Sequence, residues 1–138
     1  MCKSRCLFIL LSIFYGVCSF QVEAKSEEEV GAHLIILHTW MQVSNECTTK
    51  APVALQQTWS VMSGLFYFEI VAWENKYQSQ ARFFDEYMKA GKELSQKDYS
   101  DVRCDESDKN YLVKEMVSDP MYEIAKEAVL AGKKAGAY

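Results

Sequence analysis

Hydrophobic residues between positions 52 and 77 recur every three or four residues, which is the spacing of an α-helix. They form two neighbouring stripes along the helix surface. One stripe consists of Leu55, Trp59, Met62, Phe66, Ile70, Trp73 and Tyr77. The other consists of Val61, Leu65, Phe68 and Ala72. A helix that is apolar over so much of its circumference must be covered by other helices, by a partner or by lipid. We therefore predict that it is the central helix of a small bundle.

Similar patterns predict further helices before and after the central one. Ser26 followed by Glu29 is a capping box, which opens the first helix. Ser79 is the expected cap of the third helix, and Asp119 with Pro120 forms a cap and first-turn pair for the last. The predicted helices span residues 27–45, 52–75, 79–94, 109–117 and 120–131. Strand alternation is nowhere sustained, so the predicted fold class is all-α, a compact bundle of four to five helices with one disulfide.

The first 24 residues have the three-part pattern of a secretory signal peptide. Lys3 and Arg5 precede an apolar run over residues 7–17, and Ala24 ends a small-residue cleavage site. An uncleaved membrane anchor, the alternative, would have an unusually short apolar segment. We therefore expect residues 1–24 to be a signal peptide and residues 25–138 to form a single secreted, extracellular domain.

Cys47 and Cys104 are the two cysteines that follow residue 24. In an oxidising compartment an even pair is most simply one disulfide. A single helix over residues 52–94 would be about 65 Å long, whereas the segments that link it to the two cysteines recover only about 50 Å. The disulfide therefore requires the central helix to end at a turn, which we place between Asn75 and Ser79.

The charge of the chain excludes two classes of partner. Lys3, Arg5 and Glu23 leave with the signal peptide, so the net charge falls from −4 to about −5. An acidic chain is a poor partner for nucleic acid or for an anionic membrane surface. The apolar run of the central helix is also too short for stable membrane insertion, and it contains Glu69. An extracellular protein or a small apolar ligand remains as the expected partner.

One pair of polar residues is a candidate for chemistry. Glu69 is the carboxylate within the apolar arc of the central helix, and His33 lies in the same way between two apolar stripes of the first helix. In an antiparallel hairpin their positions along the helix axis would differ by about 6 Å. This buried polar pair could serve as acid and base or as a structural ion pair; the further alternative is that the two residues do not meet.

Motifs of known catalytic and metal sites do not occur in the sequence. A nucleophile elbow, a phosphate-binding loop and an HExxH motif are all missing. The two cysteines and two histidines that follow residue 24 do not have the spacing of zinc ligands. We therefore expect no catalytic residues, no metal site and no cofactor.

Tyr67 projects away from both apolar stripes of the central helix. Together with Val71 and Ile70 at the margin, it forms a face that packing within a bundle does not explain. Tyrosine is enriched at protein interfaces. We expect a secreted, non-enzymatic protein that binds an extracellular protein partner through this aromatic-aliphatic face. The alternative is a carrier that encloses a small apolar ligand or lipid inside the bundle. These patterns do not specify the oligomeric state.

Overall fold

The structure, a computed structural model, describes residues 25–79, 82–115 and 118–137. These residues form five helices and no strand, which confirms the all-α fold class. The helices are α1 (Glu27–Lys50), α2 (Val53–Lys76), α3 (Phe84–Asp98), α4 (Glu106–Glu115) and α5 (Asp119–Lys134). The predicted signal peptide lies outside the described residues.

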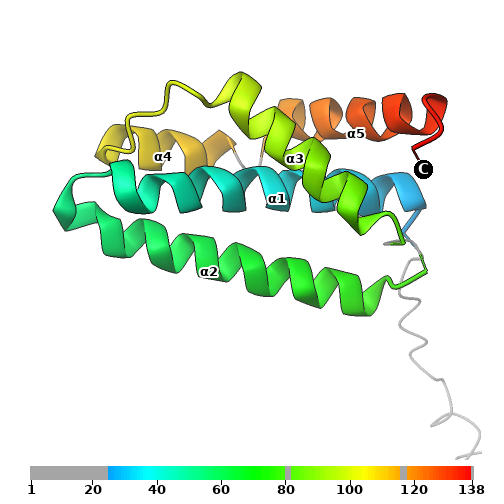
Figure 1. Ribbon diagram of the computed structural model, residues 1–138, viewed down its shortest axis with the longest axis horizontal. Coiled ribbons are helices and arrows are strands. Elements are labelled where there is room, and N and C mark those ends of the chain that lie inside the picture. Colours follow the sequence, from blue (N-terminus) through cyan, green and yellow to red (C-terminus); the bar gives the residue numbers. More distant parts are fainter. Residues whose placement is uncertain (1–24, 80–81, 116–117, 138) are drawn as a thin grey trace, which may run out of the picture.

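The central helix of the bundle is α1, not α2 as the sequence pattern predicted. Helices α2, α3 and α5 each pack against α1, which runs through the middle of the molecule (Figure 1). Thirteen residues of α1 are buried, whereas only three residues of α2 are buried. Because α1 contributes buried positions around most of its circumference, it forms the core that the sequence analysis assigned to α2.

Small residues explain how α1 can be surrounded. A Cβ atom added to Gly31 would lie 2.9 Å from the ring of Tyr87, so the absence of a side chain makes room for this aromatic ring. On α3, a Cβ added to Gly91 would lie 2.6 Å from His38 and 2.9 Å from the carbonyl oxygen of Ile35. Helix α3 therefore approaches the backbone of α1 closely, at a distance that a larger residue at position 91 would not permit.

The ends of the helices follow the predicted signals in part. The capping box of Ser26 and Glu29 is present at the start of α1. Helix α2 ends at Lys76, and Tyr77 is its C-cap, so the turn begins within the predicted segment. Helix α3 begins later than predicted: its N-cap is Phe83, whose side chain makes no capping hydrogen bond. Helix α1 extends to Lys50 and α3 to Asp98, beyond their predicted ends.

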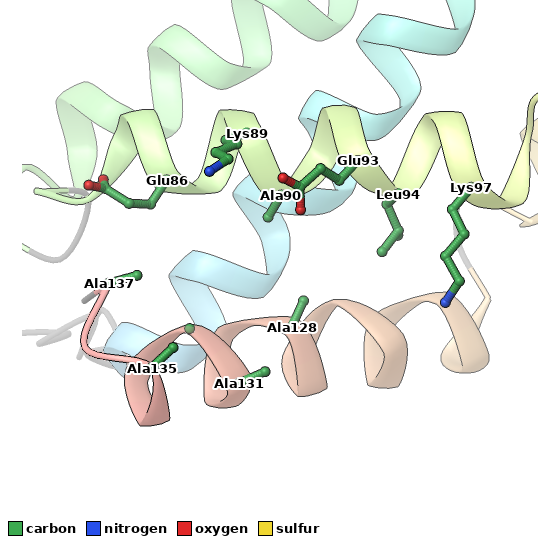
Figure 2. Close-up of a pocket in the computed structure, with 11 residues that line it drawn as sticks. Glu86, Lys89, Ala90, Glu93, Leu94, Lys97, Ala128, Ala131, Ala135 and Ala137 are labelled. Atoms are coloured by element: carbon green, nitrogen blue, oxygen red, sulfur yellow. The ribbon is translucent and has the colours of Figure 1, made fainter.

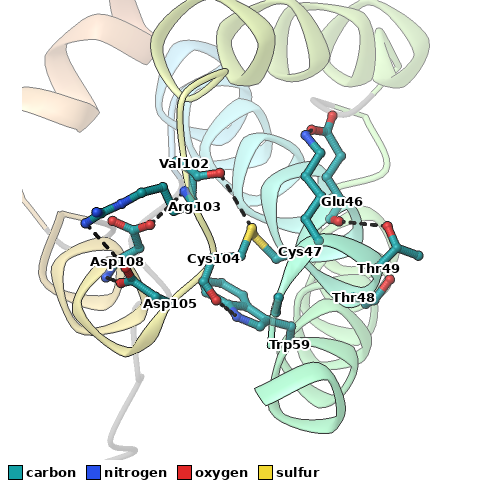
Figure 3. Close-up of a disulfide and its surroundings, with 12 residues drawn as sticks. Glu46, Cys47, Thr48, Thr49, Trp59, Val102, Arg103, Cys104, Asp105 and Asp108 are labelled. Atoms are coloured by element: carbon teal, nitrogen blue, oxygen red, sulfur yellow. Dashed lines mark hydrogen bonds and ion pairs between the residues drawn. A yellow bond between two sulfur atoms is a disulfide. The ribbon is translucent and has the colours of Figure 1, made fainter. Parts of the chain in front are cut away.

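The predicted disulfide joins Cys47 near the end of α1 to Cys104 in the loop between α3 and α4 (Figure 3). The two Cα atoms are 5.3 Å apart. Cys104 has a positive φ of 62°, a conformation that is uncommon outside glycine. The Nε1–H of Trp59, on α2, donates a hydrogen bond of 3.0 Å to the carbonyl oxygen of Cys104. The loop is thus fixed to both α1 and α2.

Replacing Trp59 with phenylalanine tests the contribution of this hydrogen bond. Trp59 is fully buried, so the carbonyl oxygen of Cys104 would lose its indole donor. We expect the free energy of unfolding to fall by about 1–3 kcal/mol beyond the effect of the smaller ring, as measured by urea denaturation. Trp40→Phe is the matched control, because the buried Nε1 of Trp40 has no hydrogen-bond partner among the described residues. Equal losses in the two variants would contradict this role of Trp59.

Candidate functional site

The two apolar stripes of α2 have different environments. The stripe that contains Trp59, Phe66 and Ile70 is buried against the core. The other stripe is exposed: Val61 is 56%, Leu65 63% and Phe68 69% exposed. The apolar pattern predicted that both stripes would be covered. The physical reason for the difference is that α2 lies at the side of the bundle, where α1 covers it from one direction (Figure 1).

We call the exposed residues Val61, Leu65, Tyr67 and Phe68 the outer face of α2. The rings of Tyr67 and Phe68 contact each other in an edge-on arrangement, with centroids 5.9 Å apart. No charged residue occurs between Lys50 and Glu69, so the outer face is neutral as well as apolar. A Cβ added to Gly64, on the same side of the helix, would meet nothing within 4 Å. The outer face is therefore open to a partner.

The structure changes the predicted set of contact residues. Tyr67 is 56% exposed, and Val71 is half-buried at the edge of the outer face. Ile70 is only 2% exposed, so its assignment to the contact face was wrong. Ile70 follows Phe66 by four residues and therefore faces α1 with it. The larger part of the surface, formed by Leu65 and Phe68, was assigned to the core.

His33 and Glu69 both contact Trp73 but do not form the predicted buried pair. The ring of His33 stacks on Trp73 with centroids 3.8 Å apart. The Nε1–H of Trp73 donates a hydrogen bond of 3.1 Å to Oε1 of Glu69. Glu69 itself is exposed. The carboxylate of Glu69 thus receives its hydrogen bond from Trp73, a residue of the same helix. The predicted burial of Glu69 was wrong.

Three effects act on the pKa of His33. Burial lowers the pKa of His33, and the charge of Lys25 lowers it further. The Glu69 carboxylate acts in the opposite direction, but its effect is the smallest of the three. Burial therefore favours the neutral form of the His33 imidazole, whose ring stacks on Trp73.

A groove of about 460 Å³ lies between α3 and α5 (Figure 2). Leu94 and Lys97 extend from α3 toward α5, and Ala128 extends from α5 toward α3. The lining residues are Glu86, Lys89, Ala90, Glu93, Leu94, Lys97, Ala128, Ala131, Gly132, Ala135 and Ala137. The small residues of α5 leave the groove wide, and it opens to solvent rather than lying inside the bundle.

His38 is a buried polar residue that no sequence pattern indicated. It is 3% exposed, and its ring lies 5.0 Å from that of Phe84. Neither ring nitrogen has a hydrogen-bond partner among the described residues. Burial lowers the pKa of His38 to about 4. The residue is therefore a neutral component of the contact between α1 and α3.

Two further observations concern the part of the chain that the structure describes. Within it, no three histidine, cysteine, aspartate or glutamate side chains are grouped so that they could bind a metal ion. None of its helices combines the length and apolar character that a membrane span requires. Comparisons with protein-family models, curated proteins and solved structures found no match for this chain.

Proposed function

We propose that the chain is a secreted, non-enzymatic helical protein that binds an extracellular protein through the outer face of α2. The observation that carries this proposal is the exposure of Val61, Leu65 and Phe68 side by side on one helix. Large contiguous apolar patches are rare on soluble monomers, and they commonly mark interaction sites. The Cys47–Cys104 disulfide supports an oxidising, extracellular location.

A protein is the partner that best suits this surface. The chain has a net charge of −4, which disfavours nucleic acid and anionic membranes. Aromatic residues dominate the energetics of many protein interfaces, and Tyr67 with Phe68 would supply such anchors. Both rings project from a regular helix, so binding would not require the backbone of α2 to be ordered first.

The Leu65→Glu variant tests the proposed function. A carboxylate at the middle of the outer face would be buried without a partner in the complex. We expect capture of the extracellular partner to weaken about thirtyfold or more, which corresponds to a loss of about 2 kcal/mol at an interface anchor. Binding should be measured between the immobilised secreted protein and extracellular fluid from the source tissue.

Leu130→Glu is the matched control. Leu130 lies on α5 and is 47% exposed, so the same substitution adds the same charge away from α2. It should leave capture unchanged. Equal binding by the Leu65→Glu variant and the unmodified protein would exclude this surface, provided that both variants have the same unfolding midpoint in urea.

A carrier function is the second candidate, and the groove between α3 and α5 favours it. The apolar floor formed by Ala128 and Ala131 would contact an acyl chain, and Lys97 would neutralise an acidic headgroup. Such a ligand would lie in an open groove rather than inside the bundle. A mass spectrum of the secreted protein under native conditions tests this candidate, since a carrier should retain a ligand of a few hundred daltons.

A further inference from the structure

The exposed side of α2 carries seven exposed positions with a regular spacing. Intervals of four and three residues alternate along it without interruption. The positions are Ala54, Thr58, Val61, Leu65, Phe68, Ala72 and Asn75. Their mean spacing is 3.5 residues, which is the repeat of a coiled-coil seam. The partner expected for such a seam is therefore another helix that lies along it.

We propose that the helix bound at this seam is α2 of a second copy of the chain. This inference rests on the proposed function, because it requires the outer face of α2 to bind protein. The seam is neutral from Ala51 to Phe68, whereas the whole chain is acidic. Two copies that meet along this strip therefore bring no charged seam position into contact. A two-fold interface also needs a self-complementary surface, in which each contact occurs twice.

An antiparallel arrangement provides that complementarity. With the two-fold axis between positions 66 and 67, Leu65 lies opposite Phe68 of the second copy. In the next layers Val61 is paired with Ala72, and Thr58 with Asn75. The largest side chains thus meet at the centre, a medium one meets a small one on either side, and polar pairs close both ends. Gly64 leaves space beside the seam for the backbone of the second helix.

The size of the seam determines how tightly the copies bind. Helix α2 has 24 residues and is therefore about 36 Å long. A strip of this length and roughly 10–15 Å width buries about 360–540 Å² per copy, or about 700–1,100 Å² in total. That total lies below the range of stable specific interfaces and within the range of weak, transient complexes. We therefore expect a reversible dimer with a dissociation constant in the micromolar range.

Sedimentation velocity of the secreted protein at about 1 to 100 µM tests the dimer. The unmodified protein should shift from monomer to dimer over this range, and so should the control Leu130→Glu. Leu65→Glu should remain monomeric, with dimerisation at least tenfold weaker. An unmodified protein that stays monomeric, or a Leu65→Glu variant that dimerises normally, would overturn the proposal.

Cysteine cross-linking tests the register. In the antiparallel dimer, Val61→Cys of one copy lies beside Ala72→Cys of the other, so a mixture of the two variants should form a disulfide on mild oxidation. Val61→Cys alone should not cross-link, because its two copies are about 16 Å apart along the axis. A parallel seam would give the opposite pattern and would contradict the proposed arrangement. Peptide mapping distinguishes these products from the native Cys47–Cys104 disulfide.

The two proposals fail in different ways. A protein that is monomeric at all concentrations, but whose partner capture depends on Leu65, would overturn the dimer and leave the proposed function supported. A dimer that dissociates in the Leu65→Glu variant supports the inference. If the monomeric Leu65→Glu variant still captures a protein other than a second copy of the chain, that protein does not bind through the outer face of α2.

Discussion

Replacing both Cys47 and Cys104 with alanine is expected to lower the free energy of unfolding by about 4 kcal/mol. The disulfide spans 57 residues, and a covalent link across a loop of this length removes a large amount of conformational entropy from the unfolded chain. It also fixes the loop after α3 next to Trp59 and the end of α1. Urea denaturation of the oxidised protein and of the double variant measures the difference.

The control for this experiment is the unmodified protein after reduction, which lacks the bond but retains both sulfur atoms. It should lose nearly the same stability as the double variant. A loss below about 1 kcal/mol in both samples would show that the packing of α1 and α2, rather than the disulfide, holds the loop in place.

Lowering the pH from about 6.5 to 4 is expected to destabilise the protein by up to about 3 kcal/mol through His38 alone. Burial lowers the pKa of His38 to about 4 in the folded state, whereas an exposed histidine has a pKa near 6.5. The unfolded chain therefore binds a proton in this interval and the folded chain does not. The contribution is fully present above pH 6.5 and is lost as the pH falls toward 4.

Urea denaturation at several pH values measures this effect. The His38→Leu variant has an apolar side chain of similar size and no titratable group at this position. The slope of its stability against pH between 4 and 6.5 should be smaller than that of the unmodified protein. Equal slopes would mean that the imidazole of His38 becomes protonated without opening the contact between α1 and α3.

The helices were predictable because they depend on residues that are close together in the sequence. The disulfide was predictable because it depends on a single pair of cysteines. Ser26 with Glu29 marked the start of α1, and the pair of cysteines required a turn after α2. The central position of α1 was not predictable from apolar content, because α2 carries the larger aromatic side chains. What places α1 at the centre is small residues such as Gly31, which allow helices to approach from several sides.

The candidate surface was predicted only at Tyr67. Sequence periodicity shows which residues share a face of α2, but not how many helices will cover that face. Leu65 was assigned to the core because too many neighbouring helices were expected. Ile70 was assigned to the surface margin because the covered side of α2 was placed too close to Leu65. The regular spacing of 3.5 residues through Leu65 and Phe68 was the available signal, since it differs from the wider spacing of the buried stripe.

The prediction for His33 and Glu69 failed for a different reason. The hairpin of α1 and α2 does bring both residues to the same region, as their positions along the chain indicated. The indole of Trp73, however, stacks on one and binds the other. Trp73, whose indole carries a hydrogen-bond donor, therefore contacts both residues. These contacts replace the direct contact between His33 and Glu69 that helix geometry alone allowed.

Photo-cross-linking from position 68 tests most directly whether the outer face of α2 binds protein. Phe68 is replaced with benzoylphenylalanine, and the secreted protein is irradiated in extracellular fluid from its source. A second variant with the same group at Glu123, an exposed position on α5, serves as the control. We predict a covalent protein adduct from position 68 and none from position 123. Equal labelling from both positions, or no protein adduct from position 68, would contradict it.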